Sequence, residues 1–421
     1  MFYTGIPVIS NWFFCFLKTK FVFTIGGVLS GLGKGITTAS IGLLLKQKGF
    51  SVTAVKIDPY ISLDAGTMRP AEHGETFVTC DGGEIDQDLG NYERFLEVEL
   101  SRDNNITTGK AYQGVIEKER AMYYGGRDAQ IFPDLINEIK ERIYSRAKGF
   151  DICMVEIGGT TGDLENLPFL HAAREIGREN RAVYVMVVYL PFLRNVGELK
   201  TKPAQHAVAS LREVGIFPDI LITRNEIPLD GPRREGLAKR TFMERENIID
   251  NPDTINVYTI PLLFEKEKVA DKVLKKLGLK NRKTDLRGWK RMVRNIQKPK
   301  KRVRIGLIGK YFRHGAEVHK DVYISVLEAI THAAAKLALK AEIVPIDSVA
   351  LGKSKYPLEA MKGYHLDGLI GPQGWGRRGT EGIIKGIEFA RRNKVPYLGL
   401  CFGMQLLVAE FARNVVGLKG A

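Results

Sequence analysis

The chain has 421 residues, which is enough for two or three domains of ordinary size. Its hydrophobic fraction of 44% and charged fraction of 26% are typical of globular proteins and exclude wholesale disorder or an integral membrane protein. The net charge is +15, and the four cysteines are far apart with no CxxC pair, so neither a disulfide framework nor a zinc site is indicated. We therefore expect a reducing, cytoplasmic location.

Residues 1–18 are predicted to be an extension of uncertain role. An apolar stretch, Val8 to Leu17, is interrupted by Ser10 and Asn11 and is shorter than the ~20 residues that cross a bilayer. Lys18 and Lys20 follow this stretch, whereas a secretory signal carries its positive charge first. We expect a leftover segment before the first domain, and an interfacial membrane anchor is the less favoured alternative.

The first domain is predicted over residues 19–279. A β-branched and aromatic run from Lys20 to Ile25 predicts a strand, and an apolar pattern from Ile36 to Lys48 predicts a helix. Further short apolar runs, with helical patterns between several of them, are Ser51 to Ile57, Asp151 to Ile157, Ala182 to Tyr189 and Asp219 to Thr223. This alternation is typical of a mostly parallel sheet with helices on both faces, so we expect an α/β domain.

A glycine-rich turn, Gly26 to Gly35, joins the first strand to the first helix. Glycine lets backbone N–H groups face phosphate oxygens, the helix N-terminus adds a positive dipole end, and Lys34 supplies a cation. The turn therefore resembles a P-loop, and a purely structural turn is the less favoured reading. Gly35 stands where the common Walker loop has a metal-binding Ser or Thr, so we expect Mg²⁺ to find other ligands.

Two acidic groups could supply those ligands. Four carboxylates lie between Asp81 and Asp88, and a second set comprises Glu156, Asp163 and Glu165. Glu156 ends a predicted strand, which is where open α/β sheets bind their ligands. So dense a group of carboxylates calls for a cation or a basic neighbour. Solvated turn acids remain the alternative for each set.

A basic segment, residues 280–302, is predicted to link two domains. Between Lys280 and Arg304 there are twelve lysines and arginines against one acid. We interpret the segment as a solvated linker, and an anionic partner is less favoured.

The α/β pattern restarts over residues 303–421. Strands are predicted at Val303 to Ile308, Lys340 to Ile346, Gly368 to Ile370 and Pro396 to Leu400, with a helix from Val322 to Leu339.

Cys401 lies between a predicted strand and a helix, with Gly399 two residues before it and Gly403 two residues after. Such glycines permit the sharp turn that exposes a nucleophile at the start of a helix. We expect Cys401 to be a nucleophile, and a buried core cysteine is the alternative.

A series of motifs between residues 20 and 280 resembles, in order, the synthetase domain of the CTP synthase family. The motifs are Gly26–Ile36, Lys56–Tyr60, Asp64–Met68, Glu72–Glu75, Asp88–Phe95, Asn104–Gly109, Glu156–Thr160 and Gly197–His206. From Val303 onward the chain resembles part of the family's class I glutamine amidotransferase domain. The expected fold is thus a P-loop-type synthetase domain followed by a partial flavodoxin-like α/β domain.

The resemblance implies amination of UTP to CTP, in which ATP phosphorylates the uracil O4 and ammonia then displaces the phosphate. Lys34 and Lys56 are implied to be catalytic, and Asp88 and Glu156 to hold Mg²⁺. The implied ATP-binding residues are Ser30, Gly31, Leu32, Gly33, Lys34, Gly35, Ile36 and Asp88. The implied UTP- or CTP-binding residues are Ser30, Asp163, Glu165, Lys200, Gln205 and Lys239. GTP as an allosteric activator and a homotetramer are further implications.

In the second domain the resemblance implies that Gly374, Phe402 and Gln405 bind glutamine or its oxyanion. Gln373 replaces a glycine of the family's oxyanion loop, and its β-carbon is harmless only if its φ is not positive. Asp134 replaces a histidine of the family near a nucleotide site, while the nearby Gln130 matches. We expect that replacement to alter charge and hydrogen bonding in the nucleotide pocket.

The family's general base, a histidine, lies far beyond the cysteine, whereas all seven histidines of this sequence precede Cys401. We therefore expect synthesis from free ammonia or with a separate C-terminal glutaminase polypeptide, and none from glutamine by this polypeptide alone. An alternative is a catalytically idle, nucleotide-binding assembly protein of the same fold. A partitioning-type ATPase on DNA is less favoured because it leaves the motif from Lys200 to His206 unexplained. Neither a membrane nor a nucleic-acid partner is expected.

Overall fold

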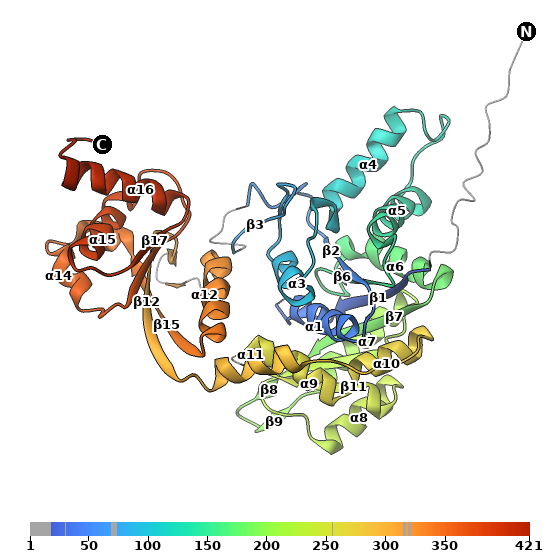
Figure 1. The fold of residues 1–421 in the computed structure, drawn as a ribbon. Coiled ribbons are helices and arrows are strands. Elements are labelled where there is room, and N and C mark those ends of the chain that lie inside the picture. The colour runs from blue at the N-terminus through green and yellow to red at the C-terminus, as the bar shows by residue number, and fades with distance from the viewer. Residues whose placement is uncertain (1–17, 30, 69–73, 255, 315–316, 319–320) are drawn as a thin grey trace, which may run out of the picture. The chain divides into compact units, whose positions relative to one another are not determined.

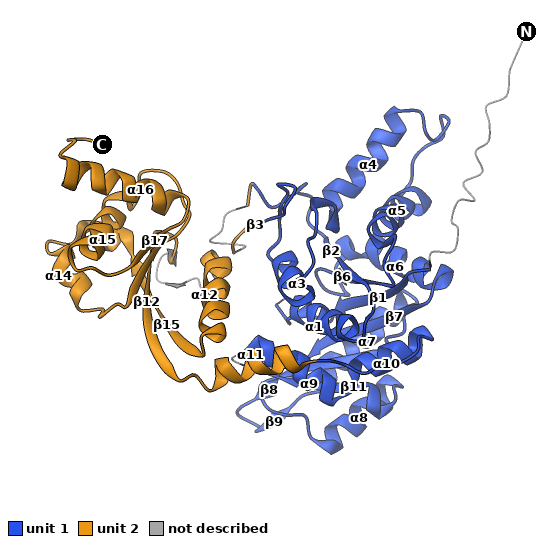
Figure 2. Ribbon diagram, in the orientation of Figure 1, with its two compact units in different colours: residues 1–66, 77–285 blue, residues 67–76, 286–421 orange. Residues whose placement is uncertain are grey.

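The computed structural model describes residues 18–421 except for positions 30, 69–73, 255, 315–316 and 319–320. The expectations for residues 1–17 and for Ser30 therefore lie outside the described residues. The chain divides into two compact units, residues 1–66 with 77–285 and residues 67–76 with 286–421 (Figure 2). In the described part of the chain, no helix combines the length and the apolar character needed to span a bilayer.

Unit 1 is built around a seven-stranded sheet in which all neighbouring strands are parallel. The order across the sheet is β11-β10-β7-β1-β6-β2-β5 (Figure 1). The strands are β1 (Lys20–Gly26), β2 (Val52–Asp58), β5 (Asn105–Thr107), β6 (Ile152–Ile157), β7 (Ala182–Tyr189), β10 (Ile220–Asn225) and β11 (Ile248–Pro252). Two short hairpins pair β3 (Phe77–Val78) with β4 (Glu84–Ile85) and β8 (Phe192–Leu193) with β9 (Glu198–Leu199).

Helices cover both faces of this sheet. Helices α5, α6 and α7 pack on one face with the main apolar core, and α1, α9 and α10 lie together on the other. The helices of unit 1 are α1 (Lys34–Gln47), α3 (Asp88–Leu96), α4 (Thr108–Arg120), α5 (Ile136–Ala147), α6 (Leu167–Glu179), α7 (Lys202–Glu213), α8 (Gly231–Thr241), α9 (Ile260–Lys266) and α10 (Val269–Leu277). Because both faces are covered, the central strands β1, β2 and β6 are almost entirely buried and mainly apolar, as the sequence predicted.

Unit 2 has a four-stranded parallel sheet in the order β15-β12-β16-β17. The strands are β12 (Lys301–Gly309), β15 (Leu339–Asp347), β16 (Gly368–Gly371) and β17 (Tyr397–Gly399). The helices are α11 (Arg287–Gln297), α12 (Ile324–Lys336), α13 (Ser348–Lys353), α14 (Pro357–Lys362), α15 (Thr380–Arg392) and α16 (Phe402–Phe411). The sheet contributes to two apolar clusters, one shared with α13, α15 and α16 and the other with α12. These two sheets confirm the predicted α/β class.

The basic segment contains a helix, α11. Its residues Arg287, Lys290, Arg291 and Arg294 are exposed, while Val293 is buried. The spacing of three and four residues places the charged side chains on one side of the helix. This segment is therefore an amphipathic helix over much of its length, rather than linker alone.

Candidate active site

The loop after β1 has the backbone expected of a phosphate-binding turn. Gly31 and Gly33 have φ values of 71° and 76°, which L-residues with side chains rarely adopt. Gly33 caps α1, and its carbonyl accepts the N–H of Thr37 at 2.9 Å. The buried Lys34 donates through Nζ to the carbonyl of Gly159 at 2.9 Å. The loop thus presents a helix N-terminus with a lysine held beside it.

Lys56 is the centre of a buried charge cluster. Strands β2 and β6 are parallel with Lys56 opposite Glu156, so the two side chains lie on the same face of the sheet. Lys56 Nζ donates to Glu156 Oε1 at 3.1 Å, lies 3.7 Å from Asp58 Oδ1 and also donates to Asp88 Oδ2 at the start of α3. Two strands and one helix therefore meet at a single ammonium group.

Burial and charge act in opposite directions in this cluster. Burial disfavours the charged form of Lys56, but the carboxylates of Asp88, Glu156 and Asp58 outweigh it and hold the Lys56 pKa well above its ordinary value. Burial raises the pKa of Glu156, and it raises that of Asp58 to about 7. Burial would also raise the Asp88 pKa, but Lys56 outweighs it and holds that pKa below the usual value. Burial lowers the pKa of Lys34.

The arrangement of Asp88 and Glu156 fits a Mg²⁺ ion. Each carboxylate bonds to the same Lys56 ammonium, so one cation can lie within reach of both. Mg²⁺ in nucleotide sites uses one or two protein carboxylates and takes its other ligands from water and phosphate. Among the described residues no group of three or more His, Cys, Asp or Glu side chains is arranged to hold a metal.

The structure gives a steric reason for glycine at position 35, where the Walker loop has a Ser or Thr. A β-carbon at Gly35 would lie only 2.3 Å from Asp88 Oδ1 and 2.9 Å from Asp88 Cγ. Real β-carbons essentially never approach other atoms so closely. The carboxylate of Asp88 therefore lies against the backbone of the residue that would otherwise carry the hydroxyl.

The structure also shows cluster members that sequence reasoning missed. Asp58 accepts a hydrogen bond from Asn105 Nδ2 at 2.7 Å, and the hydroxyl of Tyr92 donates to Glu156 Oε2. Asp58 lies in the Lys56–Tyr60 motif, and Tyr92 lies four residues after Asp88. Both residues therefore belong to motifs found in the sequence. Their hydrogen-bond partners, Asn105 and Glu156, could not be predicted because they are distant in sequence.

Three residues expected to bind UTP lie directly after β9 and on the helices α7 and α8. Lys200 follows β9 and forms an ion pair with Glu198, which also lies 3.4 Å from Arg233 of α8. Gln205 lies on α7, and Lys239 lies on α8 with a side chain that is 77% exposed. No hydrogen bond or ion pair among the described residues joins these three side chains to Lys56.

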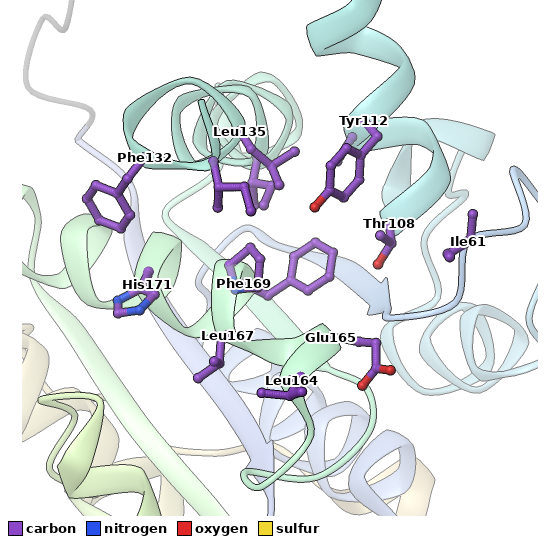
Figure 3. A pocket seen from close by; sticks show the side chains of 14 residues that line it. Ile61, Thr108, Tyr112, Phe132, Leu135, Leu164, Glu165, Leu167, Phe169 and His171 are labelled. Atoms are coloured by element: carbon purple, nitrogen blue, oxygen red, sulfur yellow. The ribbon is translucent and has the colours of Figure 1, made fainter. Parts of the chain in front are cut away.

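The loop after β6 carries the two acids of the expected pyrimidine pocket. Asp163 Oδ2 accepts the N–H of Thr160 at 2.7 Å, and Gly159 of the same loop accepts Lys34. Among the described residues lining a neighbouring cavity of 640 Å³, Glu165 has the only carboxylate (Figure 3). The rest of the lining is mainly apolar, with Ile61 and Leu164 each 78% exposed.

Asp134, which replaces the family's histidine, is a buried anion with its own partners. Arg127 donates to both of its oxygens, with Nη1 at 2.7 Å from Oδ2, and the N–H of Gln130 donates to Oδ2 at 2.9 Å. Hydrogen bonding from Arg127 holds the pKa of Asp134 below its usual value. Asp134 therefore fastens the segment that carries Gln130, and its negative charge is compensated.

In unit 2, the turn at Cys401 has the conformation of a nucleophile elbow. Cys401 has φ 50° and ψ −106°, a strained combination for a residue with a side chain, and it is exposed. A β-carbon at Gly403 would lie 2.0 Å from the carbonyl oxygen of Gly371, and one at Gly399 would lie 2.6 Å from the Met404 nitrogen. Both glycines are therefore required by the close approach of backbone segments. Phe402 and Gln405 lie in the first turns of α16, directly after the cysteine.

The expected oxyanion loop is held by a lysine that sequence reasoning missed. Gln373 is not among the residues with positive φ, so its β-carbon is not strained. The buried Lys310 donates through Nζ to the carbonyls of Trp375 and Gly376, the latter at 2.9 Å, and it lies 4.5 Å from the ring centroid of Phe402. Burial, assisted by Arg378, lowers the Lys310 pKa. Lys310 thus connects this loop to the start of α16.

Comparisons with known proteins match both units. A family model described as CTP synthase N-terminus matches residues 20–279, and one described as glutamine amidotransferase class-I matches residues 318–421. The CTP synthase of Methanocaldococcus jannaschii is 49% identical over 410 residues, which are 96% of this chain and 75% of that protein. The CTP synthase of Thermococcus gammatolerans is 49% identical over 407 residues, 96% of this chain and 74% of that protein. The solved glutaminase domain of Trypanosoma brucei CTPS with bound acivicin is 38% identical, covering 27% of this chain and 42% of that chain, with a TM-score of 0.25.

The Arg127–Asp134 pair leads to a prediction about stability and pH. The depressed pKa means that ionised Asp134 stabilises the fold above its unfolded pKa of about 3.9, and that this stabilisation is lost as pH falls through the lower folded value. Asp134→Asn should therefore reduce the free energy of unfolding by about 1–2 kcal/mol at pH 7, and the difference should shrink below pH 4. Urea unfolding at several pH values would measure it.

A matched control for that measurement is Asp103→Asn. The Asp103 side chain is 61% exposed and lies 3.7 Å from Arg146, so its replacement should change stability little. A constant difference between wild type and Asp134→Asn from pH 7 to pH 3 would contradict the role assigned to the ionised carboxylate.

Proposed function

Because this chain belongs to the CTP synthase family, we propose that it is an ATP-dependent ligase that aminates UTP to CTP through a 4-phosphorylated intermediate. The resemblance found in its motifs is confirmed by the family model and by the relatives. The observation that carries the chemistry is the buried cluster of Lys56, Asp88 and Glu156 beside the P-loop. Such a cluster suits the handling of a triphosphate at the ends of parallel strands.

The proposed reaction begins with activation of the uracil carbonyl. The O4 oxygen is a poor leaving group, whereas a phosphate ester leaves readily, so phosphoryl transfer from ATP precedes amination. The N–H groups of the loop from Gly31 to Ile36 would bind the ATP phosphates, and Lys34 and Lys56 would stabilise charge on the transferring group. The buried position of both lysines supports this role, since charge stabilisation is stronger where water is excluded.

The proposed metal ligands are Asp88 and Glu156. Bound Mg²⁺ supplies charge neutralisation of the ATP phosphates and fixes their orientation. Lys56 forms ion pairs with the same two carboxylates. With Mg²⁺ held by these carboxylates, Lys56 would lie beside the ATP phosphates.

The UTP-binding role of the remaining residues is a proposal from family membership. Lys200 and Lys239 would contact the triphosphate, because its negative charge attracts both ammonium groups. Gln205, Asp163 and Glu165 would complete that pocket, in which CTP can also bind. Activation by GTP is likewise proposed from family membership.

Nitrogen can enter the proposed reaction by two routes. Ammonia can attack C4 directly and expel the phosphate. Glutamine would need Cys401 as nucleophile, with the N–H of Phe402 and the loop at Gly374 as oxyanion donors and Gln405 beside the substrate. The elbow geometry of Cys401 supports its role as the nucleophile. With ammonium as the nitrogen donor, the synthetase reaction can be tested without glutamine hydrolysis.

The first functional prediction is that the purified chain forms CTP from UTP, ATP and ammonium. Lys34→Ala and Glu156→Ala should each lower turnover by about two orders of magnitude or more, because both groups act on charge that develops during phosphoryl transfer. Lys275→Ala and Glu213→Ala, which alter exposed residues, should retain activity. CTP would be quantified by chromatography. Full activity in both site variants would contradict the roles assigned to Lys34 and Glu156, whereas no CTP from the wild-type chain would favour an idle nucleotide-binding protein.

A second prediction concerns Gly35→Ser, which would restore the Walker hydroxyl. Because the added β-carbon displaces the Asp88 carboxylate, turnover should fall by about tenfold or more and the Mg²⁺ concentration needed for half-maximal activity should rise. Gly288→Ser in α11, where an added β-carbon meets no atom within 4 Å, is the matched control. Equal or higher activity of Gly35→Ser would show that the hydroxyl can join the metal site.

A third prediction concerns assembly. We propose a homotetramer, and the exposed apolar residues around the 640 Å³ cavity support burial of that surface. UTP with Mg-ATP should increase the tetramer fraction in sedimentation velocity, since ligands favour the state that completes their sites. Phe132→Asp should weaken the tetramer, whereas Phe217→Asp, an exposed phenylalanine outside that cavity, should not. A monomeric mass at saturating nucleotides would contradict the proposal.

A further inference from the structure

Glu156 is buried, and each of its carboxylate oxygens has a protein donor. Lys56 Nζ donates to Oε1 at 3.1 Å, and the hydroxyl of Tyr92 donates to Oε2. From this geometry we infer that Tyr92 is a positioning residue that holds Glu156 in the orientation required to bind the metal ion. The inference rests on the proposed function, because it assigns a task to Tyr92 only if Glu156 is a metal ligand.

The position of Tyr92 on α3 makes it suitable for this task. Asp88 and Tyr92 are four residues apart on α3, so their side chains lie on the same side of the helix. One helix therefore carries a proposed metal ligand and the group that orients the other ligand. Tyr92 is 0% exposed, and its neighbours Leu89 and Phe95 are also fully buried. A ring enclosed in this way cannot turn its hydroxyl elsewhere without unpacking α3.

The two donors to Glu156 differ in their other hydrogen-bond partners. Lys56 also donates to Asp88 and is proposed to act on the transferring phosphoryl group. Contact with that group would compete with the hydrogen bond from Lys56 to Glu156. Among the hydrogen bonds of the described residues, the Tyr92 hydroxyl makes only the one to Glu156. When Lys56 turns to the nucleotide, Tyr92 remains to fix which oxygen of Glu156 faces the cation.

The chemistry of the phenol also fits an orienting role. A phenol is a neutral donor, so it can hold one carboxylate oxygen without neutralising the charge that attracts a metal ion. A tyrosine phenol is ordinarily neutral at pH 7, so the hydroxyl carries the proton that it donates. Outer partners of this kind orient metal ligands in other proteins, and their loss commonly weakens metal binding 10- to 100-fold.

A purely structural role for Tyr92 predicts a different result. If the hydroxyl only satisfies a buried carboxylate, its removal lowers stability and leaves metal affinity unchanged in the molecules that remain folded. The test must therefore measure metal binding directly, besides activity.

The experiment compares wild type, Tyr92→Phe and Tyr144→Phe. Tyr144→Phe is the matched control, because Tyr144 is a largely buried tyrosine whose hydroxyl donates to another glutamate, Glu179 Oε2, at 2.6 Å. Mn²⁺ binding would be followed by electron paramagnetic resonance with a non-hydrolysable ATP analogue present. We expect Tyr92→Phe to bind Mn²⁺ about 10- to 100-fold more weakly than wild type, and Tyr144→Phe to match wild type. With ammonium as nitrogen donor, Tyr92→Phe should also raise the KM for Mg²⁺ with little change in the KM for UTP.

The outcomes separate this inference from the proposed function. If wild type shows no analogue-dependent Mn²⁺ binding, the proposed metal ligands are wrong and the inference falls with them. If wild type binds Mn²⁺ and Tyr92→Phe binds it equally well, the orienting role alone is overturned. A Tyr92→Phe chain that does not fold by circular dichroism while Tyr144→Phe does would also overturn it, since the hydrogen bond would then serve the fold.

Discussion

The contact of the Lys56 ammonium with Asp88 and Glu156 is the interaction around which the proposed synthetase site is organised. Buried charges are stable only when they are paired and hydrogen-bonded, and removal of one partner leaves the others uncompensated. Here the pairing requires the parallel register of β2 and β6 together with the start of α3. The charge cluster therefore ties the chemistry to the correct assembly of three distant segments.

In each unit, a close contact near the candidate site requires a glycine, which has no β-carbon. Gly35 lacks a β-carbon where the carboxylate of Asp88 approaches the backbone, and Gly403 lacks one where the backbone of Gly371 approaches. In the first unit the space is used by a proposed metal ligand, and in the second it permits the strained turn at Cys401. In both units a glycine thus leaves room for a close contact at the start of a helix, with a side chain at Gly35 and with backbone at Gly403.

Asp134 shows how a change of residue can be absorbed locally. Replacement of an imidazole by an acid near a nucleotide site could add negative charge, yet Arg127 and the N–H of Gln130 satisfy the carboxylate. The residue consequently acts on the shape of the segment that carries Gln130, and its negative charge is compensated within that segment. The length of that segment, with its partners four and seven residues before Asp134, is what allows this local compensation.

The sequence by itself determined the α/β class, the positions of the main strands along the chain and the glycine spacings of both loops, because periodicity and turn residues are local properties. It missed β5 and β11, which are a three-residue strand and a partly polar one at the two edges of the sheet. Only the tertiary structure decided which acid meets Lys56, since Glu156 is one hundred residues away and Asp88 thirty-two. The same holds for Tyr92 and Lys310, whose partners are set by strand register and helix packing, and these depend on the whole core and not on neighbouring residues.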